Sequence, residues 1–134
     1  MLEFAGLNWL AILVASAAAF VLGGIWYGPV FGNAWLKAIG KTKEELDPSP
    51  TPFFISMVTS LIASTVLAAL IQTLGFNTAV DGILLGLFVG VGFIATAMGS
   101  DSAFCGWGVP LFLIQSGYRI VYSVIMGVIL TVWQ

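Results

Sequence analysis

Residues 115–122 read Gln115-Ser116-Gly117-Tyr118-Arg119-Ile120-Val121-Tyr122 and lie inside an apolar run from Pro110 to Trp133. This run exceeds the ~20 residues that a helix needs to cross the hydrocarbon core of a bilayer, so it predicts a transmembrane helix. Arg119 is the only charged residue near the middle of any apolar run in the chain. Because a cation in hydrocarbon costs ~2.5 kcal/mol or more, such a residue normally faces the bundle interior or a wet cavity.

Helical spacing places four polar side chains of this stretch on one face, and these are Gln115, Tyr118, Arg119 and Tyr122. Arg119 lies ~13 Å into the span at helical rise. At that depth the other spans offer only small residues: Ala19, Ser60, Ser64 and the segment from Gly86 to Gly90. A salt bridge within one chain is therefore the less favoured explanation. The partners that remain are carbonyls, hydroxyls, water, a bound anion or a second copy of the chain.

The composition indicates an integral membrane protein with a single domain over residues 1–134. Of these residues 60% are hydrophobic and 7% are charged, whereas soluble domains carry about 25% charged residues. The net charge of −2 gives no case for binding nucleic acid. The chain has no His and one Cys, Cys105, which excludes a metal site built from His and Cys. We therefore expect no metal and no cofactor.

The hydropathy pattern predicts an all-α bundle with four transmembrane spans, at about residues 8–27, 53–74, 79–98 and 110–133. We expect the first to be a retained span rather than a signal peptide, because no basic segment precedes it. Gly28-Pro29 ends it, and a short interfacial helix follows from Asn33 to Ile39. Thr78 and Asp81 are expected to cap the third span. Residues 99–108 are predicted to form a loop.

Three lysines, Lys37, Lys41 and Lys43, lie near the longest polar loop, and no other loop has a basic residue. The positive-inside rule places this loop, Lys37–Pro52, in the cytoplasm. With four spans, both termini then lie outside.

Gly82, Gly86 and Gly90 form a repeated G-x-x-x-G ridge, which is a signal for close helix packing in an apolar segment. The partner helix can belong to the same chain or to another copy. We expect a homo-oligomer that forms through this ridge or another ridge of small residues.

The segment after the first span is dense in aromatic residues, with Trp26, Tyr27 and Trp35. Aromatic side chains gather at membrane interfaces, so an aromatic belt is one interpretation. A gate at the mouth of a substrate path is the other.

Two parts of the chain resemble a known family. Gly23 to Trp35 reads Gly-Gly-Ile-Trp-Tyr-Gly-Pro-Val-Phe-Gly-Asn-Ala-Trp. It resembles the N-terminal signature of bacterial domain-of-unknown-function family seventeen-sixty-one. Phe112–Tyr118 and Met126–Trp133 resemble the C-terminal half of that family. The resemblance implies a four-span bundle in the cell (inner) membrane and no established activity, so it assigns no catalytic residue.

Two hypotheses for function follow. In the first, the protein is a small homo-oligomeric transporter or channel-like protein, with Arg119, Gln115, Tyr118, Tyr122, Ser60 and Ser64 around a cavity for an anionic or polar solute. In the second, it is a structural or accessory membrane protein in which Arg119 only fixes helix packing. An intramembrane enzyme ranks last, because no His and no carboxylate lies at mid-membrane depth.

Overall fold

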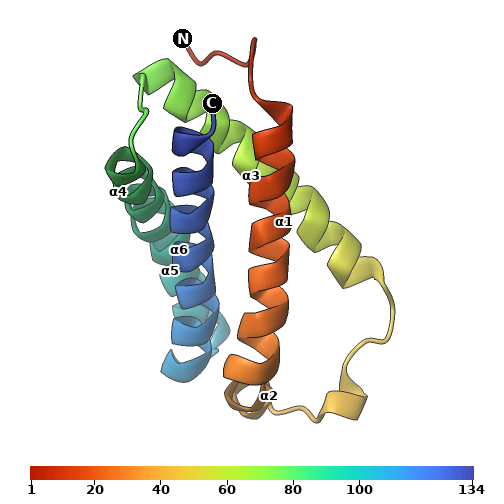
Figure 1. The fold of residues 1–134 in the computed structure, drawn as a ribbon. Coiled ribbons are helices and arrows are strands. Elements are labelled where there is room, and N and C mark those ends of the chain that lie inside the picture. Colours follow the sequence, from red (N-terminus) through yellow and green to blue (C-terminus); the bar gives the residue numbers. More distant parts are fainter.

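The computed structural model describes all residues, 1–134, and is helical throughout (Figure 1). The elements are α1 (Trp9–Ile25), η1 (Trp26–Val30), α2 (Gly32–Ile39), η2 (Lys43–Glu45), α3 (Thr51–Leu74), α4 (Ala79–Val89), η3 (Gly90–Ala95), α5 (Thr96–Cys105) and α6 (Val109–Val132). Segments η1 and η3 are π-helical and continue α1 and α4, whereas η2 is a short 3₁₀ turn. The predicted all-α architecture is confirmed, with 4 helical segments long and apolar enough to cross a membrane.

The third span is longer than predicted. It runs from Ala79 to Cys105 as one helical segment made of α4, η3 and α5. The predicted loop over residues 99–108 is therefore wrong up to Cys105, and Asp101 is exposed on a helix. The segment 96–105 contains no proline, so nothing breaks its ladder of hydrogen bonds. The helix ends where Gly106 and Gly108 take positive φ values of 68° and 83°, which glycine adopts without steric cost.

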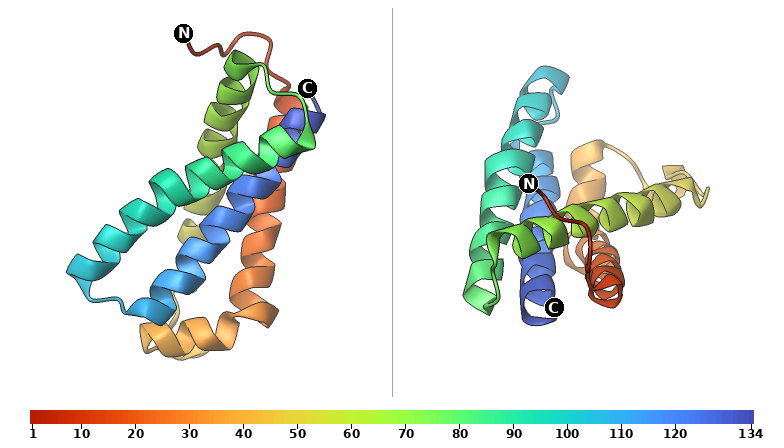
Figure 2. Two further views of the ribbon diagram at one scale, coloured as in Figure 1. Left: turned by 90° about the vertical axis from the view of Figure 1, so that its left-hand side faces the viewer. Right: turned by 90° about the horizontal axis from the view of Figure 1, so that it is seen from above.

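Helix α6 is central in a layer, between α1 on one side and the α4–η3–α5 segment on the other (Figure 2). Helix α3 crosses one face of this layer and is tilted away from α6 toward its N-terminal end. Its buried residues all lie between Ser60 and Ile71, while residues 51–59 are exposed or nearly so. Both termini lie at one end of the bundle, where the Asn8 side chain donates to the Trp133 carbonyl.

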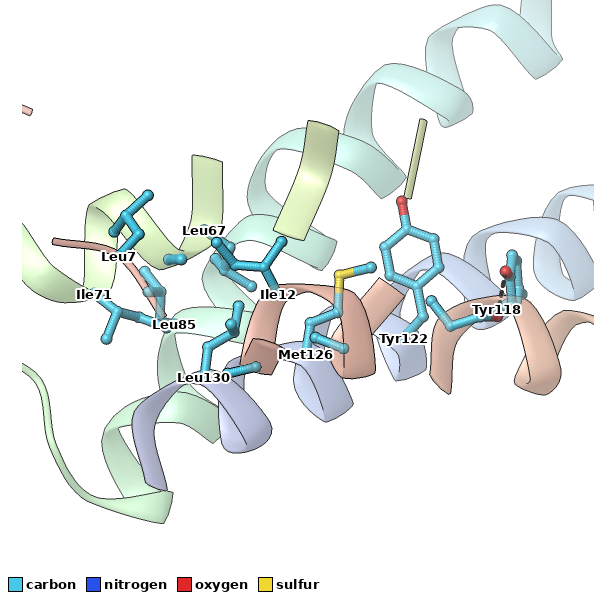
Figure 3. Close-up of a cluster of buried hydrophobic side chains, with 13 residues drawn as sticks. Leu7, Ile12, Leu67, Ile71, Leu85, Tyr118, Tyr122, Met126 and Leu130 are labelled. Atoms are coloured by element: carbon cyan, nitrogen blue, oxygen red, sulfur yellow. Dashed lines mark hydrogen bonds between the residues drawn. The ribbon is translucent and has the colours of Figure 1, made fainter. Parts of the chain in front are cut away.

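The apolar core lies in the half of the bundle near the termini. There Ile12, Leu67, Ile71, Met126 and Leu130 pack together from α1, α3 and α6 (Figure 3). Each is at most 4% exposed. These side chains close the contact between α1, α3 and α6 on the side of the bundle near the termini.

The glycine ridge of the third span packs against α6 of the same chain. A Cβ on Gly82 would collide with the backbone of Gly127. One on Gly86 would lie 2.6 Å from the Ser123 carbonyl oxygen, and one on Gly90 would lie 2.9 Å from the Ile120 Cα. The expectation that Gly82, Gly86 and Gly90 bind a second copy is therefore corrected. The ridge is already covered within the chain, because only hydrogen side chains allow two backbones to come this close.

Candidate functional site around Arg119

Tyr118 is the centre of an aromatic cluster on α6. Its hydroxyl donates to the Ala19 carbonyl of α1 at 2.8 Å, and its ring lies beside Gly23. The ring centroid is 5.4 Å from that of Tyr27 and 5.2 Å from that of Tyr122, both edge-on. Because Gly23 has no side chain, the phenol has room to reach the α1 backbone, and a Cβ on Gly23 would lie 3.0 Å from the Tyr118 hydroxyl oxygen. Tyr118 is therefore a buried link between α1 and α6.

The Arg119 guanidinium lies against two of these rings. Its Cζ is 5.4 Å from the Tyr118 centroid and 5.5 Å from the Tyr122 centroid. Such cation–π contacts contribute about 0.5–2 kcal/mol, depending on desolvation. The guanidinium donates to no protein acceptor, and no carboxylate forms an ion pair with it. Arg119 is thus a half-buried cation with favourable neighbours but no anionic partner.

The side of α6 on which Arg119 lies explains why its side chain has free space around it. Gly127, Ser123 and Ile120 face α4 and η3, and Tyr118 faces α1. Arg119 lies between Tyr118 and Ile120 around the helix, one turn before Tyr122, which faces α3 residues across the cavity described below, so Arg119 lies on the side of α6 toward α3. In this half of the bundle α3 has moved away from α6, and Phe53 near its start packs on Phe20 of α1 instead, at 6.2 Å between ring centroids.

A cavity of about 250 Å³ opens between α3, α6 and the α4–η3 segment. Helix α6 contributes Tyr122, Ser123 and Met126 to its wall. The remaining lining residues are Ala63, Val66, Leu67, Leu70, Val89 and Ile94. The Ser123 hydroxyl is satisfied by the Arg119 carbonyl at 2.8 Å, so the wall is almost entirely apolar. Tyr122 connects the Arg119 cluster to the cavity, because its ring contacts the Arg119 guanidinium and also lines the cavity wall.

Gln115 and Tyr122 are the other polar side chains on this face of α6. Gln115 is half-buried, and neither its amide nor the Tyr122 hydroxyl forms a hydrogen bond with the protein. In Figure 3 the Tyr122 phenol extends away from its own helix. Of the residues predicted from sequence, the structure therefore brings Arg119, Tyr118 and Tyr122 into one cluster, with Gln115 on the same face.

Ser60 and Ser64 lie elsewhere, in the contact between α1 and α3. The Ser64 hydroxyl is 2.6 Å from the Ser16 hydroxyl, which also donates to the Ile12 carbonyl at 2.8 Å. Ser60 is buried, and its backbone carbonyl accepts a hydrogen bond from the Ser16 hydroxyl at 3.4 Å. Both serines therefore stabilise helix packing. Ser16 was not among the residues predicted from sequence, although it is a hydroxyl in an alanine-rich stretch of α1, a signal that could have identified it.

The three aromatic residues considered as a gate are connected to this cluster. The Trp26 indole donates from Nε1 to the Ile114 carbonyl at 2.9 Å, which holds the end of α1 against α6. Tyr27 lies between Tyr118 and Trp35, with its ring centroid 5.2 Å from that of Trp35. The Trp35 Nε1 atom is buried and has no hydrogen-bond partner.

Two other reactive side chains, those of Cys105 and Asp101, lie on α5. Cys105 is exposed at the end of α5, and Asp101 is exposed on the same helix. No three His, Cys, Asp or Glu residues lie close enough together to hold a metal ion. Arg119 is the only charged side chain near the middle of a span, so its cluster is the candidate site considered below.

Four apolar spans and a single intramembrane cation define this chain as a multi-pass membrane protein. Residues 10–131 match the model of the family described as "Protein of unknown function (DUF1761)", and the chain belongs to that family. The resemblance noted in the sequence is therefore confirmed. No curated protein and no solved structure matches the chain.

Proposed function

We propose that the protein binds a small anionic or polar solute at Arg119 and carries it across the cell (inner) membrane. The observation that supports this most directly is the guanidinium itself. It is stacked on Tyr118 and Tyr122 but donates to no protein acceptor. A cation at this depth gains most from an anion, because charge attraction is strong where water is scarce.

The chemistry around Arg119 favours an oxyanion. The planar guanidinium fork matches a carboxylate or phosphate with two parallel hydrogen bonds. The Tyr122 hydroxyl and the Gln115 amide on the same face can donate to a further oxygen. Tyr118 has its hydroxyl committed to Ala19, so it supports the guanidinium through its ring.

The packing of the bundle favours a carrier over an open channel. Toward the termini, the core around Ile12, Ile71 and Leu130 fills the space between α1, α3 and α6. A solute at Arg119 can pass only if α3 or the adjoining helices move. Two π-helical segments, η1 and η3, interrupt the spans beside the site, and such segments are frequent at functional positions in helices.

We place the Lys37–Pro52 loop in the cytoplasm and both termini outside. Because α6 begins at the end of the bundle opposite the termini, Arg119 then opens toward the cytoplasmic leaflet. A homo-oligomer remains part of the proposal. It would form through lipid-facing side chains, since the glycine ridge is covered by α6.

Binding of carboxyl-labelled acetate to the protein in phosphatidylcholine nanodiscs tests this proposal. Carbon-13 NMR should show a bound carboxyl resonance for the wild type that Arg119→Gln abolishes. Gly92→Leu is a suitable control, because Gly92 has open space around it. Absence of any Arg119-dependent carboxylate binding to the wild type, whether of acetate or of a longer carboxylate, would overturn the proposal.

The second candidate is a non-catalytic accessory membrane protein. The two cation–π contacts favour it, because they give Arg119 a packing role without any ligand. In that case the wild type binds no anion, and Arg119→Gln lowers the stability of the bundle.

A further inference from the structure

We propose that the solute bound at Arg119 is a long-chain carboxylate of the fatty-acid type, which enters sideways from the bilayer. Its carboxylate would lie on the guanidinium and its chain in the cavity between α3, α6 and η3. This inference rests on the proposed function and specifies its ligand.

The two ends of the site differ in chemistry, since one is charged and the other is apolar. Arg119 supplies a charge at one end, and beyond Tyr122 the cavity wall is formed by Ala63, Val66 and Met126 together with other apolar side chains. A small hydrophilic anion would leave this wall uncovered. An amphiphile satisfies both ends at once, because the apolar wall gains from a chain and the cation gains from a carboxylate.

The single positive charge of the site favours a ligand with a single negative charge. The chain has 4 basic residues, and Lys37, Lys41 and Lys43 all lie outside the spans, so Arg119 is alone in the membrane. One guanidinium neutralises a monoanion such as a carboxylate. A phosphate monoester carries about −1.5 to −2 charges and would leave an unpaired negative charge in a medium that strongly penalises it.

The depth of Arg119 in the membrane favours a single-chain carboxylate over a phospholipid. Arg119 lies about 15 Å along α6 from its first residue, and helical side chains lean toward the N-terminus of their helix. Its guanidinium is therefore within the hydrocarbon region on the Lys37–Pro52 side, below the level of lipid phosphates. A two-chain phospholipid would have to pull its phosphate out of the headgroup layer, whereas a single-chain carboxylate reaches this depth more easily. The cavity of about 250 Å³ is smaller than the ~300–1,000 Å³ of sites that enclose a whole ligand, which suits part of one chain open to the bilayer.

Oleate and acetate carry the same carboxylate and differ in the chain, so their comparison tests the inference. Each is labelled at the carboxyl carbon and titrated into the protein in phosphatidylcholine nanodiscs, with bound signal followed by carbon-13 NMR. We expect oleate to bind at least about tenfold more tightly than acetate, since burial of even two methylene groups is worth that factor.

Ala63→Phe fills the cavity without touching the charge. We expect it to weaken oleate binding about tenfold and to leave acetate binding unchanged, whereas Arg119→Gln removes both. Ala17→Phe makes the same substitution on an exposed face of α1 and should change neither. If Ala63→Phe does not assemble, Val66→Phe replaces it, because Val66 lines the cavity and is 43% exposed.

Four results would overturn the inference. Equal affinity for oleate and acetate, or oleate binding that Ala63→Phe does not weaken, would mean that only the anion is recognised and would leave the proposed function intact. Displacement of oleate by phosphatidylglycerol but not by phosphatidylcholine would identify a two-chain phospholipid as the occupant. Failure of both carboxylates to bind the wild type would remove the proposed function as well.

Discussion

The two halves of α6 have opposite surroundings. From Ser123 onward, small residues let the backbone of α4 approach, and Met126 and Leu130 are enclosed by α3 and α1. Before Ser123, the helix carries Tyr118, Arg119 and Tyr122, and α3 tilts away from α6 toward the N-terminal end of α3 (Figures 1 and 2). The size of the residues therefore differs between the two halves of α6, and the distance to the neighbouring helices differs with it. Small residues accompany the half in which the helix backbones lie close together, and large polar and aromatic residues accompany the half in which α3 tilts away.

The largest expected effect is on the half of α6 from Ser123 onward. Gly82→Leu places a side chain where the Gly127 backbone and the Thr131 hydroxyl lie, so α4 and α6 must separate. We expect a loss of about 3 kcal/mol or failure to accumulate, as for other overpacked interiors. Unfolding by sodium dodecyl sulfate in mixed micelles measures this.

Gly92→Leu is the matched control for that change. It lies in η3 of the same span, and nothing is within 4 Å of the added Cβ. Its stability should equal that of the wild type. Equal losses for the two variants would show that α4 and α6 do not pack through the glycine ridge.

The second effect is on the half of α6 before Ser123 and changes function rather than folding. Arg119→Gln should lower uptake of labelled pyruvate into proteoliposomes at least about tenfold, because it removes a charge-assisted bidentate contact. Its unfolding midpoint should stay close to that of the wild type, since the guanidinium has no protein acceptor to lose. Arg119→Lys keeps the charge but not the fork and should retain part of the uptake. Unchanged uptake by Arg119→Gln would exclude Arg119 from the transport path.

The third prediction distinguishes the role of Tyr118 from that of Tyr122. Tyr118→Phe removes the hydrogen bond to the Ala19 carbonyl and should cost about 1 kcal/mol, in the range of interhelical hydrogen bonds in membranes. Tyr122→Phe removes a hydroxyl that bonds to no protein group, so its stability should be unchanged while acetate binding weakens. Thermal unfolding and the acetate titration together check both halves of this prediction. The reverse pattern would place the ligand beside Tyr118.

The smallest effect is at the contact between α1 and α3. Ser16→Ala removes the hydroxyl that lies 2.6 Å from the Ser64 hydroxyl, yet Ser64 keeps the Ile12 carbonyl within 3.3 Å. We expect a loss of about 0.6 kcal/mol. Thr59→Ala is the control, because the Thr59 hydroxyl is exposed and bonds only to its own helix. A loss above that of Tyr118→Phe would mean that α3 depends on Ser16 for its position.

Much of the fold could be predicted from local signals. The four spans follow from apolar length, and the capping box of Thr78 and Asp81 forms as its sequence pattern predicts. The end of α5 could not be placed in the same way. Gly99, Ser100 and Ser102 are common in loops, but within a membrane a helix that satisfies its own backbone is favoured over a loop that does not.

The candidate site was only partly predictable for a similar reason. Helical spacing placed Gln115, Tyr118, Arg119 and Tyr122 on one face. The same spacing gave no information on which helix Ser60 and Ser64 would face, and they pair with Ser16 on α1. It also gave no sign that α3 would move away from α6 beside Arg119.

The sequence by itself determined the membrane class, the family and the presence of one intramembrane cation, because these depend on composition, apolar length and local motifs. The packing of the ridge of Gly82, Gly86 and Gly90 on α6 emerges only in the tertiary structure. So does the position of Tyr122, whose ring contacts Arg119 and lines an apolar cavity. Lipid is as apolar as the helices themselves, so the hydrophobic effect does not select helix partners within the membrane. The fit of small and large residues between helices selects them, and this fit exists only once the helices are assembled.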